Sequence, residues 1–166
     1  MSSADRDGAL REHLLYLLRG GGAHLSFDDA VKDFPAGLIS ARVEGVPYTP
    51  WQVVEHMRIT QRDILEFSRD AGHVSPDWPA GYWPEPGAEA DGEAWRQSVE
   101  ALRADLKEME ALIEDPANDL YARIPHGERQ TLLREALLVA DHNAYHLGVL
   151  VALRRALEGA GGATGK

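Results

Sequence analysis

The feature that most constrains the fold is a long helical stretch near the end of the chain, from about 131 to 158, closed by Gly159. On a helix with about 100° between successive residues, Val139, Leu150 and Leu153 share one side. A second apolar side lies roughly opposite the first, and a helix that is apolar on two sides is buried on two sides. One side should face a bundle interior, and the other a short neighbouring helix or a second subunit. The second side, roughly opposite the first, carries Ala136, Ala140, Ala144, Leu147 and Val151.

Three further helices are predicted from apolar periodicity, at about 5–19, 49–70 and 92–114. Glycines follow the first two, and a proline follows the third. No segment shows the sustained alternation of a strand. The sequence therefore predicts an all-α protein, a four-helix bundle.

The second helix has the clearest start. Thr49, Pro50 and Gln52 form a capping box with proline at the first helical position. Asp91 is a plausible cap for the third helix.

The connectors on either side of the second helix are expected to differ in secondary structure. A short helix is expected after Ser26, ending before Pro35. Residues 73–92 hold four prolines, which forbid regular structure, and three large aromatic residues, which indicate packing on the rest of the molecule. Those aromatic residues are Trp78, Tyr82 and Trp83.

Composition limits the number of domains, the chemistry and the partners that we expect for this chain. With 166 residues, 44% of them hydrophobic, we expect a single helical-bundle domain over 1–166. The absence of cysteine excludes disulfides, thiolate ligands and a cysteine nucleophile. A net charge of −10 repels polyanions, so nucleic acid is not an expected partner. The first eight residues lack a signal-peptide core and charges interrupt 132–157, so we expect a cytoplasmic protein without a membrane span.

The candidate chemistry lies in the histidines. His142 and His146 are four residues apart on the last helix, so both imidazoles leave the same face. His56 lies on the inward face of the second helix and supplies a third imidazole from a neighbouring element. Such a set predicts an open site for a divalent transition metal. The alternative is a cluster of core histidines satisfied by hydrogen bonds.

Other titratable groups are weaker candidates. Glu135 lies two turns before His142, and Asp63 two turns after His56. Each is a candidate general base acting through water or a hydrogen-bond partner behind the ligands, against the alternative of an ordinary solvated or ion-paired carboxylate. His13 is expected to be a packed core residue. Surface positions are expected for the histidines in the connectors, His24, His73 and His126.

This arrangement resembles the DinB-like superfamily of metal-binding four-helix bundles. The likeness rests on His56 in Trp51-Gln-Val-Val-Glu-His-Met, and on His142 and His146 within 131–148. The resemblance implies an up-down-down-up order with a long irregular crossover between the second and third helices. The crossover would carry its aromatic residues toward the metal end, either as the wall of a pocket or as structural cover. It also implies a homodimer.

Some members of that superfamily are transferases that use bacillithiol, mycothiol or a similar small thiol. An ion held by neutral imidazoles keeps its charge and lowers the pKa of a bound thiol or water. The resemblance therefore implies a site for zinc or nickel, with iron as an alternative, and a low-molecular-weight thiol as cosubstrate. Three hypotheses follow: a metal-dependent thiol transferase or small-molecule hydrolase, a non-catalytic, stress-related module that binds a metal or small molecule, and a purely structural histidine cluster.

Overall fold

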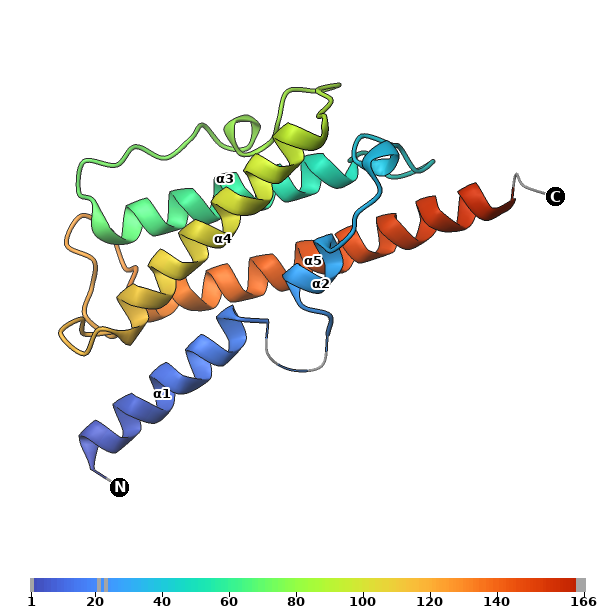
Figure 1. Ribbon diagram of the computed structural model, residues 1–166. Helices are drawn as coiled ribbons and strands as arrows, with labels where there is room; N and C mark the ends of the chain where they lie inside the picture. The colour runs from blue at the N-terminus through green and yellow to red at the C-terminus, as the bar shows by residue number, and fades with distance from the viewer. Residues whose placement is uncertain (1, 21, 23, 164–166) are drawn as a thin grey trace.

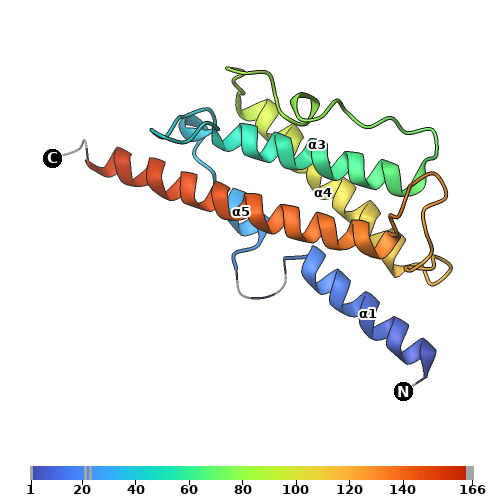
Figure 2. The same ribbon diagram turned by 180° about the vertical axis from the view of Figure 1, so that it is seen from behind.

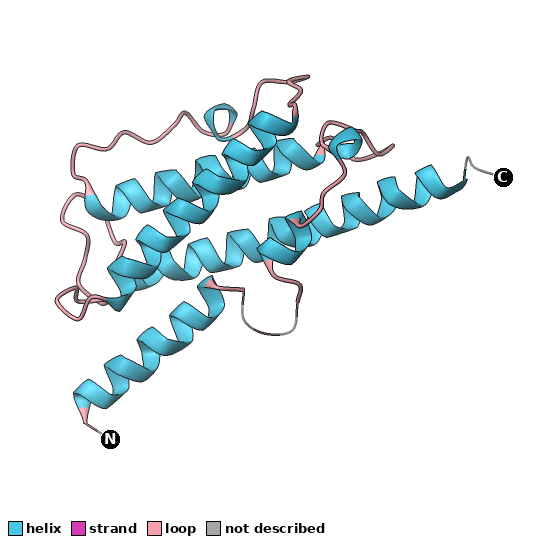
Figure 3. Cartoon of the chain, viewed as in Figure 1, coloured by secondary structure: helices cyan, strands magenta, loops and turns pink. Residues whose placement is uncertain are grey.

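The computed structural model describes residues 2–20, 22 and 24–163. Within them it is all-helical, as predicted, and no strand occurs (Figure 3). The α-helices are α1 (Ser3–Leu18), α2 (Phe27–Val31), α3 (Pro50–Arg69), α4 (Gly92–Glu114) and α5 (Leu132–Ala163). Two short 3₁₀ helices, η1 (Ala36–Leu38) and η2 (Ala80–Tyr82), interrupt the connectors.

The helices α3 and α4 begin where the sequence signals indicate. The Thr49 hydroxyl accepts a hydrogen bond from the Gln52 backbone N–H, and the Gln52 side chain accepts one from the Thr49 N–H. The Asp91 carboxylate accepts from the backbone of Glu93 and Ala94 at the start of α4. Because each cap satisfies N–H groups that lack helical partners, these boundaries are set locally.

Figure 1 shows α3 and α4 running in the same direction and α5 running in the opposite direction. The connector between α3 and α4 therefore crosses the length of α3 as irregular chain, broken only by η2. Seen from behind in Figure 2, α3 and α5 run beside one another in front of α4, and the C-terminal end of α5 extends past both. The small helix α2 packs against α5.

A polar layer divides the buried core into two apolar clusters. One cluster includes Val54, Leu102 and Leu150, and the other includes Ile64, Met109 and Val139. Between them, α3 and α5 contribute buried and half-buried polar side chains. This polar layer consists of His56, Gln61, His142, Asn143 and His146.

Two local predictions are wrong. His13 is exposed, because α1 buries the face of Arg11, Leu14 and Leu18. The buried Arg11 guanidinium donates to carbonyl oxygens at and just beyond the C-terminal end of α4, including Ile113 O at 2.6 Å, and these contacts dock α1. Gly159 does not end α5, which continues to Ala163. A glycine inside a helix costs only about 1 kcal/mol, so it need not stop one.

The last helix also has the length and composition of a membrane span. Within the part of the chain that the structure describes, Leu132–Ala160 is the one such segment, with a mean hydropathy of 1.3 in its most apolar window. The core helix of a soluble protein passes the same test, so this is weak evidence. The expectation of no membrane span stays a prediction.

Candidate metal centre

The structure brings together the three histidines that the sequence singled out. His56 comes from α3, and His142 and His146 come from successive turns of α5. His56 and His146 are buried, and His142 is half-buried. One potential ligand atom from each lies within 4.8 Å of the others.

The nitrogen positions suit a metal ion. The Nε2 atom of His56 is 3.1 Å from Nε2 of His142 and 3.1 Å from Nε2 of His146. With metal–nitrogen bonds of about 2.0–2.1 Å, two ligands are about 3.3–3.4 Å apart around a tetrahedral ion and about 2.9 Å apart around an octahedral one. The observed distances lie between these values.

A backbone carbonyl selects the tautomer of His56. The Nδ1–H of His56 donates to the carbonyl oxygen of Tyr82 at 2.7 Å, and the Thr60 hydroxyl lies 3.5 Å from the same nitrogen. With the proton on Nδ1, the Nε2 lone pair of a neutral ring faces His142 and His146. A cation placed among the three rings would accept all three lone pairs, whereas the rings alone cannot pair every one of them. The donor set therefore fits a divalent transition metal.

Burial keeps these rings neutral. It lowers the pKa of His142 to about 4, helped by the nearby His56, and lowers the pKa of His146 to about 3, helped by His142 and His56. Burial also lowers the pKa of His56, against the opposing effect of the Tyr82 carbonyl. Neutral imidazole is the form that binds metal, so at neutral pH no proton has to leave these rings first.

Aromatic rings enclose one side of the cluster. The Trp83 ring stacks on His56 with centroids 3.8 Å apart and an interplanar angle of 4°. Tyr48 stacks on Trp83 at 4.0 Å, and Tyr145 meets His146 edge-on at 4.9 Å. Of the three crossover aromatics, Tyr82 and Trp83 thus contact the site, whereas Trp78 is 80% exposed. The crossover therefore covers one face of His56, and its role as the wall of a pocket stays a prediction.

Asp63 holds the crossover in place. One carboxylate oxygen accepts from the Tyr82 hydroxyl at 2.7 Å, and the other is 2.8 Å from Nε2 of His73. Burial and Asp63 together raise the pKa of Tyr82 to about 12, so this hydroxyl stays protonated. Both oxygens of Asp63 are engaged, which fits a hydrogen-bond partner behind the ligands better than a general base. The prediction of a surface position for His73 is wrong, because its side chain is only 19% exposed.

Glu135 is buried near the start of α5 and is 2% exposed. Burial raises its pKa, and the neighbouring Arg134, whose guanidinium lies 2.8 Å from Oε1, opposes that rise. Among the described residues it makes no hydrogen bond to the three histidines. Its catalytic role and that of Asp63 stay predictions.

Sequence reasoning missed an amide relay beside the cluster. Asn143 Nδ2 donates to Gln61 Oε1 at 2.7 Å, and Gln61 Nε2 donates to the Leu102 carbonyl at 2.6 Å. The relay fixes the orientation of both amides, because only their NH₂ groups can donate. Asn143 Oδ1 is buried and has no hydrogen-bond partner among the described residues. The available signal was the position of Asn143 between the two histidines of α5.

Comparison with known proteins decides the family. The family model described as the DinB superfamily matches residues 25–150, which is more than half of the chain. The chain belongs to the DinB superfamily. No curated protein and no solved structure matches it.

All three histidines lie inside the stretch that matches the DinB superfamily, and α1 lies outside it. DinB-superfamily proteins are typically metal-binding. Family membership and the converging imidazoles are therefore compatible with a metal centre in this DinB-superfamily chain.

Proposed function

We propose that this DinB-superfamily chain holds one divalent transition-metal ion on His56, His142 and His146 and uses it to activate a small thiol or water. The observation that carries the proposal is the convergence of three Nε2 atoms whose neighbouring groups keep the rings neutral. Zinc and nickel are the proposed ions and iron the alternative, since imidazole ligands suit all three. Three protein ligands leave coordination positions for a thiol or water.

When bound, such an ion supplies Lewis acidity that makes a thiol or water nucleophilic at neutral pH. The protein's own residues provide the rest. Tyr82 holds the His56 ring through its carbonyl, and Asp63 holds Tyr82. Trp83, stacked on the outer face of His56, keeps water from that side of the ring. The chain carries no cysteine, so a thiol nucleophile would have to come from a cosubstrate.

A second candidate is a non-catalytic module that binds a metal or a small molecule. The observation that favours it is the state of the two carboxylates. Asp63 is fully engaged by Tyr82 and His73, and Glu135 is paired with Arg134. Neither is therefore free beside the histidines to move a proton.

The decisive measurement is the metal content of untagged protein purified without chelators, by elemental analysis. We expect about one equivalent of zinc, nickel or iron per chain. In His142→Ala the content should fall by at least tenfold. His13→Ala, which removes an exposed histidine, is the matched control and should keep the full content. If His142→Ala retains as much metal as His13→Ala, the site assignment is wrong.

Activity is tested separately on metal-loaded protein. Bacillithiol, mycothiol and glutathione are each offered with the electrophile monochlorobimane, and conjugate formation is followed by fluorescence. Turnover with one thiol that is lost in His142→Ala supports the transferase. Failure with every thiol, in protein that holds one equivalent of metal, eliminates thiol transfer and leaves hydrolysis or the non-catalytic module.

A further inference from the structure

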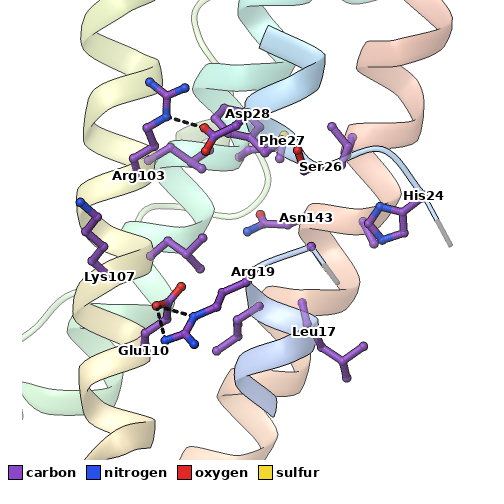
Figure 4. Close-up of a pocket in the computed structure, with 18 residues that line it drawn as sticks. Leu17, Arg19, His24, Ser26, Phe27, Asp28, Arg103, Lys107, Glu110 and Asn143 are labelled. Carbon is purple, nitrogen blue, oxygen red and sulfur yellow. Dashed lines mark hydrogen bonds and ion pairs between the residues drawn. The ribbon is translucent and has the colours of Figure 1, made fainter. Parts of the chain in front are cut away.

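A cavity of about 340 Å³ lies between the C-terminal end of α1, α2, α4 and α5. Figure 4 shows side chains from all of these elements around it. Pockets that bind small molecules start at about 300 Å³, so this one suits a small ligand. Its floor is apolar and comes from four helices: Leu18, Met57, Leu102, Leu106 and Leu147.

Charged side chains gather around the mouth. Arg19 pairs with Glu110 at 3.0 Å and also with Glu114 at 2.6 Å, and Arg103 pairs with Asp28 at 2.6 Å. Lys107 lies on α4 between these two pairs (Figure 4). It forms no ion pair with any residue that the structure describes. Of the lysine and arginine side chains that line the cavity in the described part of the chain, Lys107 is therefore the one that no carboxylate pairs.

The cavity is distinct from the metal centre but borders it. Met57, Asn143 and Leu147 line the cavity, and they directly follow His56, His142 and His146 in sequence. Successive residues on a helix point about 100° apart. The histidines thus face the candidate metal centre, and the residues that follow them face the cavity on another side of α3 and α5.

We propose that this cavity binds a small amphipathic anion, with a hydrocarbon body of about eight carbons on the apolar floor and a carboxylate at Lys107. Burial of the hydrocarbon provides most of the affinity, because an exposed ion pair contributes little. The carboxylate selects the ligand's charge and orientation. The binding requires no metal and stands whether or not the proposed metal-dependent function is correct.

The first test is calorimetric titration of the full chain with butanoate, hexanoate and octanoate, and with octylammonium as the cationic counterpart. We expect the Kd to fall about fourfold for each added methylene, the equivalent of about 0.8 kcal/mol per CH₂. Octylammonium should bind at least fivefold more weakly than octanoate. The absence of octanoate binding at millimolar concentration overturns the proposal. Equal affinity for octylammonium overturns the assignment of an anion.

Variants then locate the site. Ala144→Phe places a ring at an exposed position on the cavity wall and should abolish octanoate binding. Lys107→Glu should raise the Kd about fivefold, which matches an exposed ion pair. Arg123→Glu makes the same change of charge at an exposed residue outside the cavity and should leave the Kd unchanged. If the two charge variants behave alike, or if Ala144→Phe binds octanoate normally, the ligand lies elsewhere.

Discussion

At the scale of single residues, the carbonyl of Tyr82 determines which nitrogen of His56 is available to an ion. A backbone carbonyl cannot be recognised from residue type, because every residue carries one. The shared face of the candidate ligands His142 and His146 could be predicted from the sequence, since they are four residues apart on a helix. The groups behind them could not, because the contacts of Asp63 with Tyr82 and His73 depend on the path of the crossover.

The lowered histidine pKa values predict how metal-free protein responds to acid. His142 has a pKa of about 4 in the folded chain and about 6.5 when unfolded. Between these values the unfolded state binds more protons, so the free energy of unfolding falls as pH decreases from about 6.5 toward 4. We expect a loss on the order of 2 kcal/mol from this ring between pH 7.5 and 5.0.

Urea denaturation in the presence of a chelator at the two pH values measures this loss. His142→Gln should show a smaller difference between them, because glutamine does not titrate. An equal pH difference in His142→Gln and the parent would assign the acid sensitivity to other groups.

Tyr82→Phe tests the support behind His56. The variant keeps the carbonyl and the ring but removes the hydroxyl that donates to Asp63 at 2.7 Å. We expect zinc affinity to fall about tenfold, the lower end for groups that support a metal ligand. Competition with a chromophoric chelator measures the affinity. Tyr121→Phe is the control at an exposed tyrosine and should bind zinc as the parent does. Unchanged affinity in Tyr82→Phe would mean that the crossover does not position His56.

At the scale of the element, α3 shows which helix boundaries can be predicted from local sequence signals. Thr49, Pro50 and Gln52 mark its start correctly because a capping box uses only neighbouring atoms. Helix ends are marked less well, as the continuation of α5 through Gly159 shows. The exposure of His13 could not be read from α1 alone, because the buried face depends on where Arg11 meets the end of α4.

Thr49→Ala should destabilise the protein by about 1–2 kcal/mol, since the cap hydroxyl is fully buried and its loss leaves an N–H unpaired. Urea denaturation gives the value. Ser2→Ala removes an exposed cap at the start of α1 and should cost less than half as much. A loss below about 0.3 kcal/mol in Thr49→Ala would show that the cap does not hold α3.

At the scale of the whole molecule, the candidate metal centre and the cavity both border α3 and α5. The all-α class was predictable from periodicity, but the cavity was not, because it forms where five separate helices leave space. Sequence patterns report which face of a helix is buried and do not report how completely that face is filled.

Because Met57, Asn143 and Leu147 border the cavity beside the three histidines, occupancy of one site should affect the other. We expect saturating octanoate to change zinc affinity at least threefold, and zinc to change octanoate affinity by the same factor. Titration of each ligand in the presence and absence of the other measures both factors. Two independent affinities would show that the shared walls are rigid.

The polar layer across the bundle should affect how cooperatively the chain unfolds. It separates two apolar clusters, each with its own contributions from α3, α4 and α5. Because apolar packing is interrupted at this layer, we expect amide hydrogen exchange of the metal-free chain to resolve the two clusters as cooperative units with different protection. An ion held from both α3 and α5 would tie the units at their boundary. The histidine cluster would then govern the cooperativity of unfolding as well as the proposed function.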